Sequence, residues 1–186
     1  MARSDVLDEA TAVRESARVV AAPEEITDAI ERMARWISDT VGTSCPTVLA
    51  VMRGGAFTAT RVCSRVRVPY RFDYVHGTRY GDEVTGGKLS WPVPPSPNLA
   101  GETVVIVDDI LDRGVTLADL YARLEAIGAA RILSAVLVSK DVEMPKERPR
   151  PDFVGLRIDD HYVFGCGMDY KGFWRGLPAL YAVDDT

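Results

Sequence analysis

The chain has 186 residues, 22 basic against 27 acidic side chains, a formal net charge of -5 and 47% hydrophobic residues. This composition is that of one globular domain with a core, and it excludes disordered and collagen-like chains. The negative net charge argues against broad, salt-sensitive binding to nucleic acid. No apolar run approaches the roughly 20 residues that span a bilayer, and the acidic N-terminal residues do not fit a signal peptide. The three cysteines are widely spaced, which fits reduced thiols in a cytoplasmic protein. From the charge and the lack of a long apolar run, we expect that it binds neither nucleic acid nor membrane.

The hydrophobic pattern predicts helices and strands in alternation. Helices are predicted where apolar residues recur at three- and four-residue steps, and buried strands where short runs are almost wholly apolar. In chain order the predicted elements are a helix over 26–41, a strand over 47–52, a helix over 56–66, strands over 69–76 and 103–107, a helix that follows Gly114 and ends at Gly128, and strands over 132–138, 153–158 and 162–164. This order indicates an α/β fold, a parallel sheet flanked by helices.

Residues 77–101 are the exception, because they contain five glycines and four prolines and show no convincing period. A segment of this length without secondary structure is unusual in a compact domain unless it is a lid, a binding loop or a floppy hairpin. We therefore expect a mobile and functional segment here.

The residues that carry chemistry follow two of the predicted strands. Ligands of open α/β sheets bind beyond the carboxyl ends of the strands, where this chain places Arg53 and Gly54 in one case and Asp108 and Asp109 in the other. Carboxylates at such a place can bond sugar hydroxyls or bind a hydrated Mg²⁺. Taken alone, two acids at a strand end are also found in phosphatases, response regulators and helix caps.

Residues 112–116 predict a phosphate cradle at the start of the following helix. Gly114 permits a positive φ, consecutive backbone N–H groups can converge, and Thr116 offers a hydroxyl where the helix dipole favours an anion. The patterns G-x-x-x-x-G-K-[ST] and G-x-G-x-x-G are absent, so the sequence supports neither a P-loop NTPase nor a Rossmann dinucleotide enzyme.

The full segment VVIVDDILDRGVTL at 104–117 resembles the phosphoribosyl-pyrophosphate (PRPP) signature of type I phosphoribosyltransferases. VMRGGAF at 51–57 is similar to the pyrophosphate loop of that family, and RPDFVG at 150–155 to a further landmark. YVFGCGMDYKGFWRGLP at 162–178 resembles the purine-binding segment of the hypoxanthine-guanine branch. The resemblance covers most of the chain from Val48 onward. It implies one domain over 1–186, with a core of about 25–165, a lid of about 77–101 and a small hood formed from the terminal segments, about 1–22 and 166–186.

The resemblance also implies a purine salvage enzyme that converts hypoxanthine or guanine plus PRPP to the nucleoside monophosphate plus pyrophosphate, with Mg²⁺ as cofactor. PRPP binding is implied for Asp108, Asp109, Asp112, Arg113, Gly114, Val115 and Thr116. Pyrophosphate binding is implied for Arg53, Gly54 and Arg175, and purine binding for Lys140, Tyr162, Val163 and Asp169. The further implied roles are Asp112 as general base, Asp108 and Asp169 as Mg²⁺ ligands, and Tyr80 as a lid residue. Family habit implies a homodimer or homotetramer.

Two other functions fit the same pattern. A xanthine-preferring relative would share these residues, and a regulatory protein could keep the PRPP fold and bind RNA, although the net charge argues against the latter. Lys140 also fits a solvated strand-end lysine, and Arg175 a surface ion pair. Arg113 stands where a small hydroxyl residue is usual, and we expect it to point outward. Arg53 stands where lysine is frequent, which keeps the charge but changes its geometry.

Overall fold

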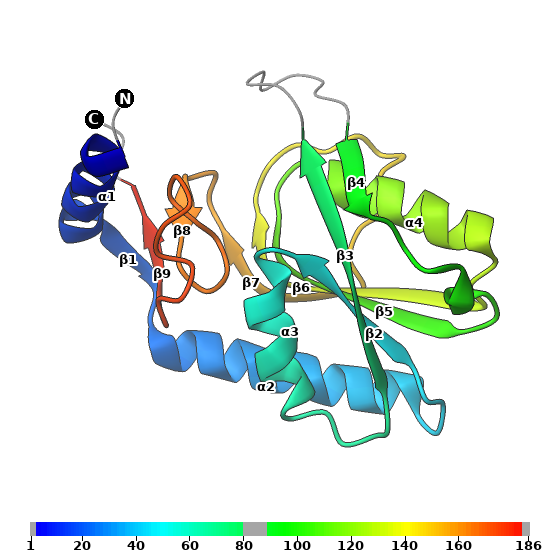
Figure 1. Cartoon of the computed structure of the whole chain (residues 1–186). Helices are drawn as coiled ribbons and strands as arrows, with labels where there is room; N and C mark the ends of the chain where they lie inside the picture. Colours follow the sequence, from blue (N-terminus) through cyan, green and yellow to red (C-terminus); the bar gives the residue numbers. More distant parts are fainter. Residues whose placement is uncertain (1–2, 80–88, 184–186) are drawn as a thin grey trace.

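The computed structural model of the chain describes residues 3–79 and 89–183, which form two sheets (Figure 1). The larger sheet has the strand order β4-β3-β2-β5-β6-β7 and the smaller one β1-β9-β8. The strands are β1 Arg18–Ala21, β2 Thr47–Met52, β3 Arg71–Arg79, β4 Leu89–Val93, β5 Thr103–Leu111, β6 Arg131–Lys140, β7 Phe153–Ile158, β8 Val163–Phe164 and β9 Leu180–Ala182. The helices are α1 Arg3–Ser16, α2 Pro23–Val41, α3 Gly55–Cys63 and α4 Val115–Ile127, with a 3-10 turn η1 at Pro97–Leu99.

The larger sheet is parallel except for β4, which pairs antiparallel with β3 at one edge. From β2 the chain passes through α3 to β3 on one side, and from β5 it passes through α4 to β6 on the other side. The strand order therefore reverses between β2 and β5. In open α/β sheets a crevice forms at such a reversal, beyond the carboxyl ends of the two strands.

Helices cover both faces of the larger sheet. Successive side chains of a strand point to opposite faces, so Val48 and Ala50 of β2 join the core beneath α2 and α3, whereas Leu49 and Val51 join the core beneath α4. This double cover explains the nearly all-apolar sequence of β2. No helix in the described part of the chain is long and apolar enough to cross a membrane.

The smaller sheet joins the two ends of the described chain. β9 pairs antiparallel with β1 on one side and with β8 on the other, and α1 lies beside them (Figure 1). Ala21, Val163 and Leu180 of this sheet belong to the same buried core as α2. The prediction that 162–164 completes the main sheet is wrong, because β8 finds its partner in the C-terminal strand β9.

Strand β5 is longer than the predicted 103–107. Its pairing with β2 stops at Val107, but its pairing with β6 continues to Leu111, opposite Ser139. Because one neighbour continues the ladder, Asp108 and Asp109 lie inside the strand rather than after it.

A hairpin is among the forms expected for residues 77–101, and both ends of this segment have regular structure, in the β3–β4 hairpin and in η1. Trp91 of β4 supplies the physical reason, because its Nε1 donates to Oδ2 of Asp119 on α4 at 2.6 Å. The guanidinium of Arg123 lies 5.6 Å from the centre of the Trp91 ring. Tyr80, the expected lid residue, lies outside the described residues.

The smaller sheet depends on a close backbone approach at Gly165. Its φ is +97°, and a Cβ there would lie 2.2 Å from the carbonyl oxygen of Ala179. We expect Gly165→Ala to lower the free energy of unfolding by about 3 kcal/mol, because a left-handed backbone and an overlap with a buried carbonyl both oppose the new methyl group.

Gly128→Ala is the matched control. Gly128 has a φ of +87°, and in the described part of the chain no atom beyond its chain neighbours lies within 4 Å of the place that the methyl group would take. The free energy of unfolding of this variant should fall by only about 1 kcal/mol, the cost of the left-handed backbone alone. Urea denaturation of both variants measures the difference, and equal losses would contradict the predicted overlap.

Candidate functional site

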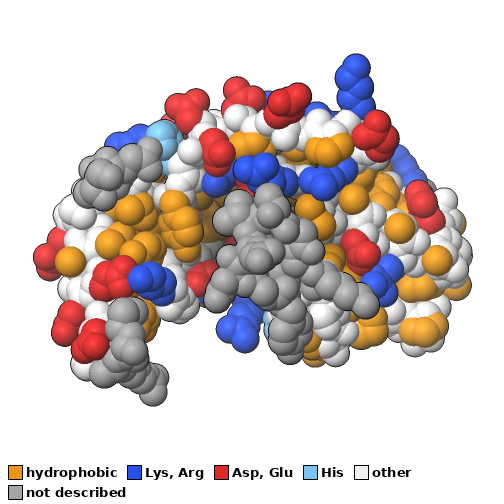
Figure 2. Space-filling view, turned by 90° about the horizontal axis from the view of Figure 1, so that it is seen from above, with side chains coloured by type: hydrophobic (Ala, Val, Ile, Leu, Met, Phe, Trp, Pro, Cys, Tyr) orange, Lys and Arg blue, Asp and Glu red, His pale blue; other side chains and the backbone are white. Residues whose placement is uncertain are grey.

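A cavity of about 290 Å³ opens at the carboxyl ends of β2 and β5, at the reversal of strand order. It brings together three segments that the sequence singled out, namely the turn after β2, the end of β5 and the start of α4, and adds the β3–β4 hairpin. Its lining residues are Val51, Met52, Arg53, Gly54, Gly77, Leu89, Asp108, Asp109, Ile110, Leu111, Asp112, Arg113, Gly114, Val115, Thr116, Leu117, Val136 and Arg175. Figure 2 looks onto this face from above and shows acidic and basic side chains interspersed around its centre.

Asp108 and Asp109 lie at the centre of the cavity. The backbone N–H of Asp109 donates to Oδ1 of Asp108 at 2.9 Å, and that of Ile110 donates to Oδ1 of Asp109 at 3.0 Å. Burial raises the pKa of Asp108 well above its ordinary value, and the neighbouring Asp109 carboxyl raises it further. Burial also raises the pKa of Asp109, although the positive charge of Arg175 opposes that rise. The pair is therefore costly to ionise unless a ligand supplies hydrogen-bond donors or positive charge.

Two glycines allow close packing around Asp109. A Cβ at Gly54 would lie 1.8 Å from Oδ2 of Asp109, and one at Gly167 would lie 2.4 Å from the carbonyl oxygen of Gly54. Gly167 also has a φ of +117°, a backbone conformation that residues with a side chain rarely adopt. Three segments far apart in the sequence meet at this point. The sequence offered no reason to connect Gly167 with Asp109, because only the folded chain makes the contact.

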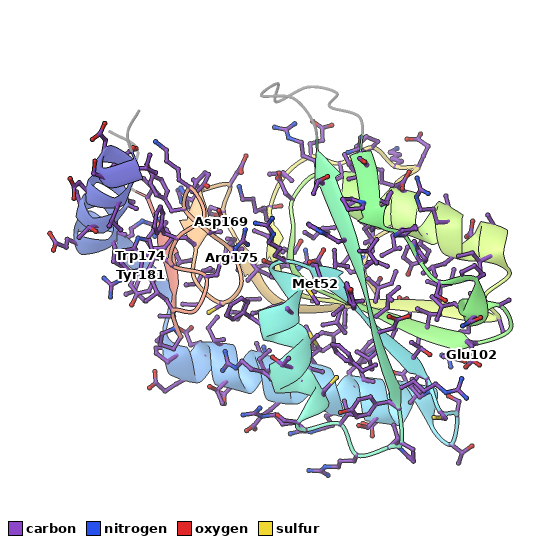
Figure 3. All side chains as sticks on the ribbon, viewed as in Figure 1. Met52, Glu102, Asp169, Trp174, Arg175 and Tyr181 are labelled. Atoms are coloured by element: carbon purple, nitrogen blue, oxygen red, sulfur yellow. The ribbon has the colours of Figure 1, made fainter. Side chains whose placement is uncertain are left out.

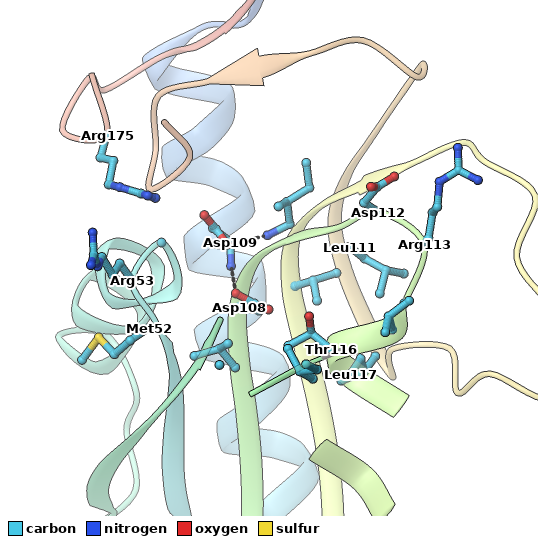
Figure 4. A pocket seen from close by; sticks show the side chains of 18 residues that line it. Met52, Arg53, Asp108, Asp109, Leu111, Asp112, Arg113, Thr116, Leu117 and Arg175 are labelled. Atoms are coloured by element: carbon cyan, nitrogen blue, oxygen red, sulfur yellow. Dashed lines mark hydrogen bonds between the residues drawn. The ribbon is translucent and has the colours of Figure 1, made fainter. Parts of the chain in front are cut away.

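The turn before α4 has the geometry of an anion cradle. Gly114 adopts a left-handed conformation with φ 70° and forms the N-cap of α4, and Thr116 in the first turn of that helix lines the cavity. The first N–H groups of a helix have no partner within it, and the helix dipole adds positive potential there. Arg113 is exposed and points away from Thr116 (Figure 4), although it also lines the cavity, and its carbonyl oxygen accepts a hydrogen bond from Arg148.

Positive and negative side chains occupy different parts of the cavity. Figure 4 shows Arg53 and Arg175 on one side of the two aspartates and the 112–116 loop on the other side. Arg53 is exposed and follows Met52 through a cis peptide bond. Arg175 is held in place by its ion pair with Oδ1 of Asp169 at 2.5 Å and by donation to the carbonyl oxygen of Gly167 at 2.8 Å. Across the cavity, the two arginines are thus followed by the two buried aspartates and then by the N-terminus of α4 with its preceding loop.

The four residues expected to bind a purine do not line this cavity among the described residues. Tyr162 is 53% exposed and donates its hydroxyl to the carbonyl oxygen of Asp169 at 3.1 Å, which connects it to Arg175 at the rim of the cavity. Val163 is buried in β8. Lys140 ends β6, and its Nζ pairs with Oδ1 of Asp160 at 2.9 Å, a partner that the sequence did not indicate.

Comparison with protein families decides the class of this site. The family model described as the phosphoribosyl transferase domain matches residues 19–171. This chain belongs to the phosphoribosyltransferase family. The match includes the turn after β2, both aspartates and the cradle at the start of α4, but not α1 or Arg175.

Individual relatives resemble this phosphoribosyltransferase over most of their length. It is 24% identical to the hypoxanthine-guanine-xanthine phosphoribosyltransferase of Tritrichomonas foetus, over 88% of this chain and 89% of the relative. It is 28% identical to the hypoxanthine-guanine phosphoribosyltransferase of Aquifex aeolicus, over 87% and 92%.

Solved structures show the same fold. A hypoxanthine-guanine phosphoribosyltransferase from Bacillus anthracis superposes with a TM-score of 0.83 at 24% identity, covering 90% of this chain and 98% of the other. A mutant hypoxanthine phosphoribosyltransferase from Trypanosoma cruzi, in a ternary substrates complex, superposes with a TM-score of 0.80 at 27% identity, covering 91% and 95%. The order of elements around the cavity is therefore that of known phosphoribosyltransferases.

The raised pKa of Asp108 gives a prediction about the stability of this phosphoribosyltransferase. An aspartate whose folded pKa lies above its ordinary value of 3.8 contributes stability only while protonated, and that contribution is lost as the pH rises through the folded pKa. At pH 7 Asp108 therefore destabilises the protein, and Asp108→Asn should raise the free energy of unfolding by on the order of 1 kcal/mol.

The gain should shrink at pH 4, where the folded wild type carries the proton. Asp39→Asn, which removes the same charge from an exposed position of α2, is the control. Urea denaturation at the two pH values measures both variants without substrate. A variant at Asp108 that is no more stable than the control at pH 7 would contradict the assignment.

Proposed function

We propose that this phosphoribosyltransferase transfers the phosphoribosyl group of PRPP to a 6-oxopurine, hypoxanthine or guanine, and releases pyrophosphate. The order of charges across the cavity is the observation that carries this proposal. PRPP presents a 5′-phosphate, then ribose hydroxyls, then a pyrophosphate at C1, which matches the cradle at α4, the two aspartates and the two arginines in sequence. The relatives named for hypoxanthine and guanine support the choice of base.

The reaction breaks the bond between C1 and pyrophosphate and forms a bond from C1 to N9 of the purine. Negative charge grows on the departing pyrophosphate, so Arg53 and Arg175 would stabilise the transition state from their side of the cavity. Asp112 lines the cavity at the mouth of the cradle, where its carboxylate would accept the proton of purine N7 as general base. Lining residues such as Gly77 and Leu89 would limit the access of water to the reacting carbon.

A divalent cation fits part of this site. Asp108 offers carboxylate oxygens, which Mg²⁺ prefers, beside the place proposed for the ribose and pyrophosphate. Both carboxylate oxygens of Asp169 are already bound, Oδ1 to Arg175 and Oδ2 to the N–H of Gly172, and no group of three metal-binding side chains gathers in residues 3–79 and 89–183. We therefore propose that Mg²⁺ is held mainly by oxygens of PRPP together with Asp108. When bound, it would neutralise part of the pyrophosphate charge.

Lys140 is the residue proposed to choose the base. An ammonium group has three hydrogens and no acceptor, and one hydrogen is used by Asp160, so two remain for the O6 acceptor of a 6-oxopurine. Adenine carries a donor at the same position and would leave the ammonium unpaired, at a cost of a few kcal/mol. Tyr162, with more than half of its side chain exposed, would stack on the base, and Val163 would read its edge through the backbone.

We also propose that the chain forms a homodimer or homotetramer in the cytoplasm. Register places Phe72 and Tyr74 beside Val48 and Ala50, on the face covered by α2 and α3, yet Phe72 is 47% and Tyr74 44% exposed. Phe57 of α3 is 40% exposed. Uncovered aromatic rings of this kind favour self-association. The three free cysteines suit a reducing compartment.

The role of Asp112 gives the first functional prediction. Asp112→Asn should leave PRPP affinity within a few-fold of the wild type but lower kcat by about 10² to 10⁴, because the amide cannot accept the N7 proton. Steady-state kinetics and equilibrium binding of PRPP separate the two effects. A variant with nearly wild-type kcat would remove Asp112 from the proposed role.

A panel of four bases tests the function itself. With PRPP and Mg²⁺, we expect turnover of hypoxanthine and guanine and little of adenine. Lys140→Ala should raise the KM for both 6-oxopurines by about tenfold and narrow the gap to adenine, whereas Lys146→Ala, at an exposed lysine of the 141–152 connection, should change neither. Preference for xanthine would correct the proposed base, and no turnover of any base would contradict the proposed function.

A further inference from the structure

The loop that carries Asp169 and Arg175 is closed by its own backbone but has an unfavourable conformation. Tyr170 and Phe173 exchange two backbone hydrogen bonds, of 3.0 and 2.9 Å. Lys171 has a φ of 47° and Trp174 a φ of 70°. Both values lie in the left-handed region, which residues other than glycine rarely adopt. Each such residue costs about 1 to 2 kcal/mol. The loop therefore needs contacts from outside to keep the shape that presents Arg175 to the cavity.

Helix α1 makes these contacts at the two strained residues. The Glu9 carboxylate accepts hydrogen bonds from Lys171 Nζ at 2.5 and 2.7 Å and from the Tyr170 hydroxyl at 2.8 Å. Trp174 donates its Nε1 to the carbonyl oxygen of Ala10 at 2.7 Å. Both strained residues that carry side chains are thus bound by consecutive residues of α1.

The contacts lie on the opposite side of the loop from the cavity. Figure 3 shows Trp174 and Tyr181 on the side facing α1, and Arg175 on the side facing the larger sheet. Trp174 directly precedes Arg175, so the hydrogen bond to Ala10 fixes the backbone from which the Arg175 side chain leaves. The hydrogen bonds from Lys171 and Tyr170 lower the pKa of Glu9.

Helix α1 buries little of its described surface. Among its side chains whose burial the structure describes, only Ala10 is buried, and Leu7 is 46% exposed. Arg14 adds a cation contact 4.4 Å above the Tyr181 ring of β9. A helix with so little apolar burial contributes little to the core. Its most specific described contacts are with the loop of Asp169 and Arg175.

We propose that Glu9 is a positioning residue that, through Tyr170 and Lys171, holds Arg175 in the geometry that binds pyrophosphate. The inference rests on the proposed function for the identity of the ligand, and both Glu9 and Arg175 lie outside residues 19–171, which the family model matches. Helix α1 acts as a brace behind the loop: it supports the backbone from which Arg175 leaves, while Asp169 and the Gly167 carbonyl hold the guanidinium itself.

The test compares Glu9→Ala with Glu15→Ala, which removes the same side chain from an exposed position of the same helix. Hydrogen exchange of the 167–175 amides should rise by about tenfold in Glu9→Ala alone, and exchange in β5 should stay unchanged. Calorimetry with inorganic pyrophosphate and Mg²⁺ should show affinity about tenfold weaker, because a misplaced charged group loses most of its contribution. Glu9→Gln, which keeps an acceptor for the Tyr170 hydroxyl, should restore part of both.

Two results would overturn the inference. One is a Glu9→Ala variant that matches Glu15→Ala in loop exchange and in pyrophosphate affinity. The other is faster exchange in β5 as well as in the loop, which would mean that Glu9 only stabilises the whole fold. Turnover of hypoxanthine with PRPP by the wild type is measured alongside. Its absence would contradict the proposed function, while loop exchange would still decide whether α1 holds the loop.

Discussion

The burial of two adjacent aspartates at the end of β5 is the constraint on which the rest of the site depends. Asp108 and Asp109 lie where the strand order reverses, and burial raises the pKa of both carboxyls. Gly54 and Gly167 have no side chains because the Asp109 carboxylate and the Gly54 backbone occupy the space that a Cβ would need. The turn after β2, the middle of the sheet and the C-terminal segment are thereby fixed around one acidic centre, and a ligand rich in hydroxyls and bound cations relieves its cost.

Two regions proposed to bind anions, which differ in physical nature, lie on either side of this centre. On one side the helix start at Val115 offers rigid backbone donors, and on the other Arg53 and Arg175 offer charged side chains. A monoester phosphate that stays attached throughout the reaction suits the rigid cradle. A pyrophosphate that gains charge as it leaves is better served by guanidinium groups, whose contribution grows in the transition state. The proposed bracing of Arg175 by α1 would fix the direction of one of these groups without touching the ligand.

Several parts of this arrangement were predictable because they depend on local sequence. The apolar run 47–52 is typical of a strand covered on both faces, and Gly114 and Gly128 mark the two ends of α4 with left-handed conformations. The string at 104–117 placed two aspartates beside a phosphate cradle, and the cavity contains all of them. The roles assigned to individual residues stay predictions until substrate binding and turnover are measured.

The sequence by itself determined the α/β fold, because hydrophobic period and turn residues act over a few positions. The resemblance of the 104–117 segment indicated the family and the chemical character of the site. Tertiary structure alone decided that β6 extends β5 past Asp109, that β8 leaves the main sheet for β9, and that Trp91 packs the β4 edge onto α4. It also decided the pairing of Lys140 with Asp160 and of Glu9 with Lys171. Each of these contacts joins residues with no periodic relation, so their energy exists only once the core has set the distance between the segments.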